Sequence, residues 1–95
     1  MTRYTVVWDV DVEAPFMNFW IASDSHMRAI LTEIANWIDK NLSEDADLKG
    51  RPHADSTDRT AVVPLAGRRA NVVVTYRVIP DDRLVRVTRR TFRRV

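Results

Sequence analysis

The chain has 95 residues, enough for one hydrophobic core and too few for two, so we expect a single domain over residues 1–95. With 45% hydrophobic residues, two Gly and four Pro, its composition excludes a disordered or low-complexity chain, and the absence of Cys excludes disulfides and thiolate metal sites. The net charge of +2 excludes no class of partner, because the two halves of the chain differ in sign.

Residues 2–10 are rich in β-forming side chains that alternate with a period of two. Tyr4, Val6 and Trp8 fall on one face, and Thr5 and Val7 fall on the other. This pattern predicts a first strand with one apolar face.

Two helices are predicted after this strand, because the apolar spacing changes at Asp11 to three and four residues. Pro15 is compatible with the first helix only near its first turn, where the missing N–H costs nothing. Residues 22–25 interrupt the pattern and offer capping oxygens for the second helix. The two apolar stripes are Val12, Phe16, Phe19 and Trp20, then Met27, Ile30, Leu31, Ile34, Trp37 and Ile38. We expect the pair to form an αα-hairpin, with a core made by Trp8, Trp20, Trp37, Phe16 and Phe19.

Residues 41–58 are polar and predict a surface connection. At about eighteen residues it is longer than most loops, which indicates a functional segment, a segment ordered by a partner, or an unrecognised short element. His53, Asp55 and Asp58 are candidate ligands for a weak metal site, but a mobile loop explains them better, so we expect no metal and no cofactor.

Three further strands are predicted at residues 59–65, 71–79 and 83–91, separated by turns at 66–69 and 80–82. The second of them is apolar on both faces, which is typical of a central strand. Short connections favour antiparallel pairing. The order β-α-α-β-β-β therefore predicts an α+β fold in which a helical hairpin packs on a twisted antiparallel sheet.

The basic residues gather in the C-terminal half. Residues 1–48 carry three cations and nine carboxylates, whereas residues 49–95 carry twelve cations and four carboxylates. On a regular strand Arg86 and Arg90 share a face, and Arg77 can join them from the neighbouring strand. Such guanidinium groups bind phosphates, and the rings of Phe92 and Tyr76 offer aromatic surfaces on which bases can stack. The alternative is a solvated face that prevents aggregation. The candidate residues for binding a nucleic acid or an acidic protein partner are Arg77, Arg86, Arg90, Phe92 and Arg93.

Other candidate sites have simpler explanations. His26 lies at the expected start of the second helix, and the acidic group Asp9, Asp11 and Glu13 matches an ordinary strand-to-helix cap. No phosphate-binding glycine motif and no nucleophile elbow occurs. No apolar run approaches the ~20 residues of a membrane helix and no signal-peptide pattern is present, so we expect a cytoplasmic protein without a membrane partner.

The last two predicted strands and the turn between them have a recognisable pattern. A Tyr-x-Val strand around Tyr76 is followed by the acidic turn Pro80-Asp81-Asp82 and by a Val-x-Val strand, Val85-Arg86-Val87. Tyr4-Thr5-Val6-Val7-Trp8 at the start, and Trp37-Ile38-Asp39 with Leu42, complete the pattern. Over most of its length the chain thus resembles the RelE/ParE superfamily of toxins from type II toxin–antitoxin systems.

The resemblance implies a helical hairpin on a twisted sheet and a cognate antitoxin, encoded alongside, that masks the basic surface. It also implies an inhibitor of growth whose target differs between members. RelE-like proteins cleave messenger RNA in the ribosome, and ParE-like proteins inhibit DNA gyrase.

The sequence departs from the pattern of the cleaving members. Ala61, Val63 and Val73 stand where those members place Lys or Arg, and Phe92 stands in place of a terminal Tyr, so one group for acid–base chemistry is lost. The remaining candidate catalytic residues are Arg68, Arg69, Arg86 and Arg89. Three hypotheses stay open: a ribosome-dependent ribonuclease, a gyrase inhibitor, and an inactive relic that only binds an antitoxin.

Overall fold

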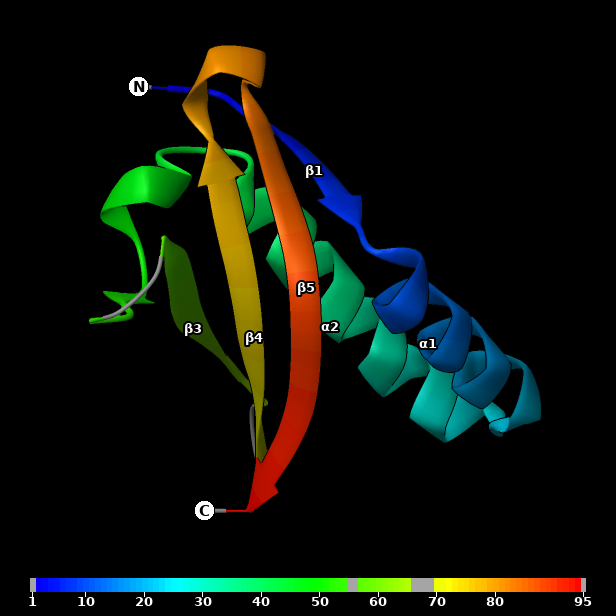
Figure 1. The fold of residues 1–95 in the computed structure, drawn as a ribbon. Helices are drawn as coiled ribbons and strands as arrows, with labels where there is room; N and C mark the ends of the chain where they lie inside the picture. The colour runs from blue at the N-terminus through cyan, green and yellow to red at the C-terminus, as the bar shows by residue number, and fades with distance from the viewer. Residues whose placement is uncertain (1, 55–56, 66–69, 95) are drawn as a thin grey trace.

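The computed structural model describes residues 2–54, 57–65 and 70–94, of which 70 and 92–94 are described by their backbone alone. Its elements follow the predicted order, with two short elements added in the 41–58 segment (Figure 1). They are β1 (Thr5–Trp8), α1 (Val10–Ala22), α2 (Ser25–Leu42), the 3₁₀ turn η1 (Ala46–Leu48), β2 (Arg51–Pro52), β3 (Asp58–Pro64), β4 (Ala70–Ile79), the 3₁₀ turn η2 (Pro80–Asp82) and β5 (Leu84–Arg94).

The five strands form one sheet in the order β1-β5-β4-β3-β2. The predicted antiparallel meander of β3, β4 and β5 is confirmed. One pair differs from the prediction of a wholly antiparallel sheet, because β1 runs parallel to β5 and makes the sheet mixed. The two helices carry the chain across one face of the sheet, so its first and last strands become neighbours (Figure 1).

Both helices cover the same face of the sheet and leave the opposite face open (Figure 1). The core lies between these layers and is mainly aliphatic, with α2 as the main contributor from the helices. Val6 and Trp8 of β1, and Tyr4 just before it, face this core, as the alternation predicts. The fully buried residues of the core are Leu31, Ile34, Ile38, Leu42, Ala46, Val63, Val72, Val74, Tyr76, Val85 and Val87.

Helix α1 buries a narrower face than its sequence predicts. Val12 and Phe16 are buried and Trp20 is partly buried, but 47% of Phe19 is exposed, so the expectation that Phe19 is a core residue is wrong. The helix begins at Val10, which places Pro15 in the second turn and not in the first. Pro15 has no N–H to donate to the carbonyl of Asp11, four residues earlier, so this turn lacks one helical hydrogen bond.

Helix α2 is the most regular element of the chain. Asp24 caps it by accepting a hydrogen bond from the N–H of Met27 at 2.9 Å, as predicted for the 22–25 break. Arg28 then ties the hairpin together: it donates to the carbonyls of Trp20 and Ile21, and its guanidinium carbon lies 4.4 Å from the centre of the Trp20 ring. Among the described residues, no helix is long and apolar enough to cross a membrane.

The 41–58 segment is held to the sheet by Tyr76. The Tyr76 hydroxyl donates towards the carbonyls of Lys49 at 2.7 Å and Ala46 at 3.0 Å. Of the interpretations offered for this segment, the unrecognised short element is confirmed by η1 and β2. Because Tyr76 is fully buried on the helix side of β4, the expectation that its ring stacks on bases is wrong.

Candidate nucleic-acid interface

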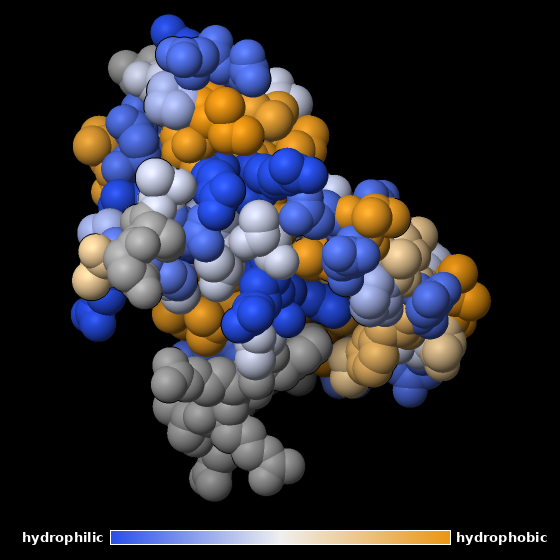
Figure 2. All heavy atoms as spheres, viewed as in Figure 1, coloured by the Kyte–Doolittle hydropathy of each residue, from blue (hydrophilic) through white to orange (hydrophobic). Residues whose placement is uncertain are grey.

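The open face of the sheet carries the polar groups of the central strands. Alternation from the buried residues of β3, β4 and β5 places three described arginines on this face: Arg77, Arg86 and Arg89. Hydrophilic side chains gather over the middle of β4 and β5 in the same view (Figure 2). We call Arg77, Arg86 and Arg89, with the threonines between them, the arginine face.

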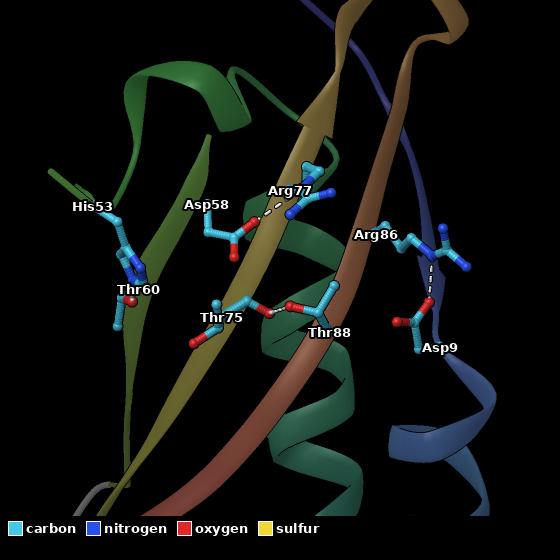
Figure 3. Close-up of polar contacts among 8 residues, drawn as sticks. All are labelled: Asp9, His53, Asp58, Thr60, Thr75, Arg77, Arg86 and Thr88. Atoms are coloured by element: carbon cyan, nitrogen blue, oxygen red, sulfur yellow. Dashed lines mark hydrogen bonds and ion pairs between the residues drawn. The ribbon is translucent and has the colours of Figure 1, made fainter. Parts of the chain in front are cut away.

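A β-bulge in β5 decides which arginines belong to this face. Tyr76 lies opposite Val87 and Thr75 lies opposite Arg89, so Thr88 is the extra residue on β5. The Thr88 hydroxyl donates to the carbonyl of Thr75 at 3.3 Å across the two strands (Figure 3). Past the bulge the alternation of β5 shifts by one residue, which turns Arg89 to the open face.

Arg90 consequently lies on the helix side, opposite the buried Val74. Its guanidinium carbon is 4.5 Å from the centre of the Phe16 ring of α1, and burial lowers the pKa of Arg90. The expectation that Arg86 and Arg90 share a face is therefore wrong. A regular strand would place them together, but the bulge between them separates them.

Arg77 and Arg86 lie directly opposite one another on β4 and β5, and each is paired with a carboxylate. The Nε of Arg77 donates to Asp58 Oδ1 at 2.9 Å, and the Nε of Arg86 donates to Asp9 Oδ1 (Figure 3). The two arginine side chains remain 50% and 55% exposed. Exposed pairs of this kind contribute only about 0–1 kcal/mol, so an anionic ligand can displace the carboxylates.

His53 is a residue of this face that sequence reasoning assigned to a mobile loop. Pairing of the backbone with β3 places it beside Thr60, and His53 Nε2 lies 2.6 Å from Thr60 Oγ1 (Figure 3). Thr60, Thr75 and Arg89 occupy one row across β3, β4 and β5. No sequence signal indicates this position, because it depends on the pairing of β2. The described residues contain no cluster of His and carboxylates suited to a metal ion.

The remaining candidates are placed as follows. Arg68 and Arg69 lie outside the described residues, and Phe92 and Arg93 are described only by their backbone pairing with Val72 and Asn71. His26 is exposed in the first turn of α2.

The three positions at which the cleaving members of the family carry Lys or Arg do not all lie on the same face of the sheet. Ala61 and Val63 point into the core, where a cation could not reach the open face, and Val73 lies on the open face. The outward positions of β3 beside Val73 are Thr60 and Val62, neither of which is basic.

No protein-family model matches the sequence, and no curated protein matches it. The structure is similar to a chain of the toxin–antitoxin complex RelBE2 from Mycobacterium tuberculosis, with a TM-score of 0.70 and 18% identity over 98% of this chain and 94% of that one. The chain has a RelE-like fold. A chain of the intact E. coli RelBE toxin–antitoxin complex also aligns, at 15% identity, over 92% of this chain and 93% of that one, with a TM-score of 0.48.

On this RelE-like fold, the described arginine face can bind and neutralise phosphates, but it offers few groups that move protons. Arginine stays protonated at neutral pH and is a poor general base. Tyr76 is buried, and burial raises the pKa of its hydroxyl. Among the described residues of this face, His53 carries the only imidazole, and its Nε2 lies beside Thr60.

Proposed function

We propose that the chain is the toxin of a type II toxin–antitoxin system, which binds a cognate antitoxin and acts on RNA through its arginine face. The observation that supports this most directly is the RelE-like fold together with three arginines on the uncovered face of its sheet. Guanidinium groups on adjacent strands suit the phosphates of a single strand.

Induction of the chain in a bacterial host tests the toxin assignment. We expect growth arrest, and we expect co-expression of the small protein encoded next to it to restore growth and to co-purify with it. The double variant Arg86→Ala with Arg89→Ala should relieve the arrest, whereas Arg3→Ala, at an exposed arginine with only a 3.8 Å contact to Glu44, should not. Normal growth on induction of a stably folded chain would contradict the proposal.

Translation in vitro tests the action on RNA. We expect cuts in ribosome-bound messenger RNA that are lost in the Arg86→Ala and Arg89→Ala double variant. Cuts that persist in this variant would show that the arginine face is not the site.

Gyrase inhibition is the second candidate, and the absence of cations at Ala61, Val63 and Val73 favours it. If it is correct, supercoiling by DNA gyrase falls as the protein is added, and no messenger RNA is cut. Unchanged supercoiling at excess protein removes this candidate. A folded chain that arrests nothing, yet binds its neighbour, would be an inactive antitoxin-binding relic.

A further inference from the structure

The first strand forms one edge of the sheet. β1 pairs with β5 on one side, and within the described ranges no strand pairs with it on the other (Figure 1). The N–H of Asp9, directly after β1, donates to the carbonyl of Val87 on β5 at 2.9 Å. Backbone groups alternate along a strand, so those of Val7 also point to β5, whereas those of Val6 and Trp8 point outward.

The open part of this edge is short and has a defined start. The N–H of Tyr4 donates outward to the carbonyl of Ser43 at 2.8 Å, and Arg3 forms a bridge with Glu44. The segment that follows α2 therefore covers the chain before β1. Only β1 itself, four residues long, presents an open edge.

β1 lacks the features that keep strand edges from pairing. Residues Thr5–Trp8 include no charged residue, no proline and no glycine, and they pair with β5 without a bulge. The strand at the opposite end of the sheet, β2, has only two residues, Arg51 and Pro52, and a charge and a proline are typical protections of an edge. An uncharged, regular edge such as β1 is a template for a further strand.

The apolar surface continues from β1 onto α1. Val7 is 36% exposed and Val10 is 72% exposed, so apolar side chains reach solvent at the strand and at the start of the helix. Three more residues of α1 expose apolar side chains, namely Met17, Phe19 and Ile21. A helix that is apolar on its outer side as well as its inner side is normally covered on both sides.

The sequence of β1 is complementary to itself in one antiparallel register. When Val7 lies opposite Val7 of a second copy, Val6 lies opposite Trp8 and Thr5 lies opposite Asp9. Val6 and Trp8 carry the outward backbone groups, so they form the hydrogen-bonded pairs, and Val7 forms the non-hydrogen-bonded pair. Pairs of an aromatic and a β-branched residue stabilise a sheet, and no like charges lie opposite one another in this register.

A groove of about 460 Å³ beside β1 suits the aromatic side chain that this register brings to it. β1 and α1 line the groove together with Ala35 and Asp39 of α2. Trp8 of the second copy, opposite Val6, points to the same side of the sheet as Val6, and this is the side of the helices. Burial raises the pKa of Asp39, and an indole N–H, which can only donate, suits such a carboxylate.

We propose that two copies of the chain pair through β1 in this register and join their sheets into one. The inference goes beyond the proposed function and does not depend on it. The local two-fold axis of an antiparallel pair is perpendicular to the sheet, so the helices of both copies lie on one side and both arginine faces lie on the other. Arg86 lies beside Val7 in the register of β1 and β5, so the two arginine faces meet across the Val7 pair.

A single cysteine tests the register, because the chain has no Cys of its own. Val7→Cys should give a disulfide-linked dimer on mild oxidation, since the two Cα atoms of a non-hydrogen-bonded pair are about 4.5 Å apart and a disulfide spans about 4.4–6.8 Å. Thr5→Cys, on the same face of β1, is the matched control, because its two Cα atoms would be about 14 Å apart in the dimer. Equal cross-linking of the two variants, or none in either, would overturn the inference.

Lysine substitutions test the interface without a covalent bond. Sedimentation equilibrium of the purified chain alone should show a dimer that forms as the concentration rises. Val7→Lys places two like charges opposite one another and should weaken the dimer about tenfold or more, whereas Thr5→Lys meets Asp9 of the second copy and should not. A dimer that Val7→Lys leaves intact while the variant is folded, or a chain that is monomeric up to about 1 mM, would overturn the inference.

Amide hydrogen exchange identifies the occupant of the edge. The Val6 amide should become more protected as the concentration of the free chain rises, and the Val7 amide, which points to β5, is the internal control because it should be protected throughout. If the Val6 amide is protected only after the co-encoded neighbour is added, that protein and not a second copy occupies the edge, and the inference is wrong.

The tests of the dimer and of the proposed function fail separately. A chain that arrests growth and binds its neighbour, yet shows neither the cross-link nor the dimer, overturns this inference alone. A chain that forms the dimer and has no effect on growth overturns the proposed function alone.

Discussion

Arg77 and Arg86 are cross-strand partners on β4 and β5, and Asp58 and Asp9 flank them on either side. Two like charges directly opposite one another destabilise a sheet, and here each is offset by its own carboxylate. The row is therefore neutral in the free protein and becomes a site for two negative charges once the carboxylates are displaced.

Asp9→Asn should increase the affinity for single-stranded RNA. The change frees Arg86 from its carboxylate, and Asn remains a good residue at the start of α1. Because an exposed ion pair contributes about 0–1 kcal/mol, we expect an increase of up to about fivefold, measured by fluorescence anisotropy with a labelled oligonucleotide. Asp11→Asn, in the first turn of the same helix, removes the same charge from a residue that forms no ion pair with the described residues, and is the control. Equal effects of the two variants would mean that only net charge matters.

The salt dependence of RNA binding should match the number of described arginines on the arginine face. Three phosphate contacts give a slope of about −2 in log affinity against log salt, and a fourth contact gives about −3. Arg89→Ala should make the slope shallower by about 0.7. A slope near zero, measured by the same anisotropy titration at several salt concentrations, would argue against phosphate contacts.

Arg89 and Arg90 point to opposite faces of the sheet, so substituting each by alanine should affect stability and RNA binding differently. Arg90→Ala removes the contact with Phe16 and should lower the free energy of unfolding by about 1 kcal/mol, with RNA binding of the folded protein preserved. Arg89→Ala should leave stability unchanged and weaken RNA binding. Urea unfolding monitored by tryptophan fluorescence, together with anisotropy, distinguishes them. The reverse result would show that the bulge does not set the faces as described.

Tyr76→Phe should destabilise the protein by about 1–3 kcal/mol, because the carbonyls of Ala46 and Lys49 lose their shared donor. Urea unfolding measures this loss.

The Tyr76 hydroxyl should also make the stability depend on pH. Burial raises the pKa of Tyr76 in the folded state above its usual value of 10.0, so the unfolded chain loses this proton first as the pH rises. The contribution of this hydroxyl to the free energy of unfolding is therefore present below about pH 10 and is lost as the pH rises above it. The decline should be smaller in Tyr76→Phe, as measured by urea unfolding across this range.

The sequence predicts the helices and strands better than it predicts how they pair and which contacts they make. Helix α2 is predicted in full because its apolar spacing and the Asp24 cap are local signals. The parallel pairing of β1 is not predictable in this way, because its alternation is the same for either direction. The 46–52 segment depends on hydrogen bonds from Arg59 and from Tyr76, and Tyr76 lies on β4, far from this segment along the chain.

The candidate site was predicted in part for a related reason. Arg77 and Arg86 are exposed on neighbouring strands, as the alternation predicts, but Thr88 carries no sequence mark of a bulge. A one-residue shift turns every later side chain to the other face, so regular alternation predicts the wrong side for Arg90. His53 was missed because only its pairing with β3 places it near the arginine face.

The place of β5 between β1 and β4 has a consequence for how the protein is made. β5 follows the other four described strands along the chain and yet occupies an interior position of the sheet, so a nascent chain cannot close this sheet until β5 has left the ribosome. A stop codon shortly before Leu84 would therefore not trim an edge from the product. It would remove the strand that joins β1 to β4, and β1 would lose its place in the sheet.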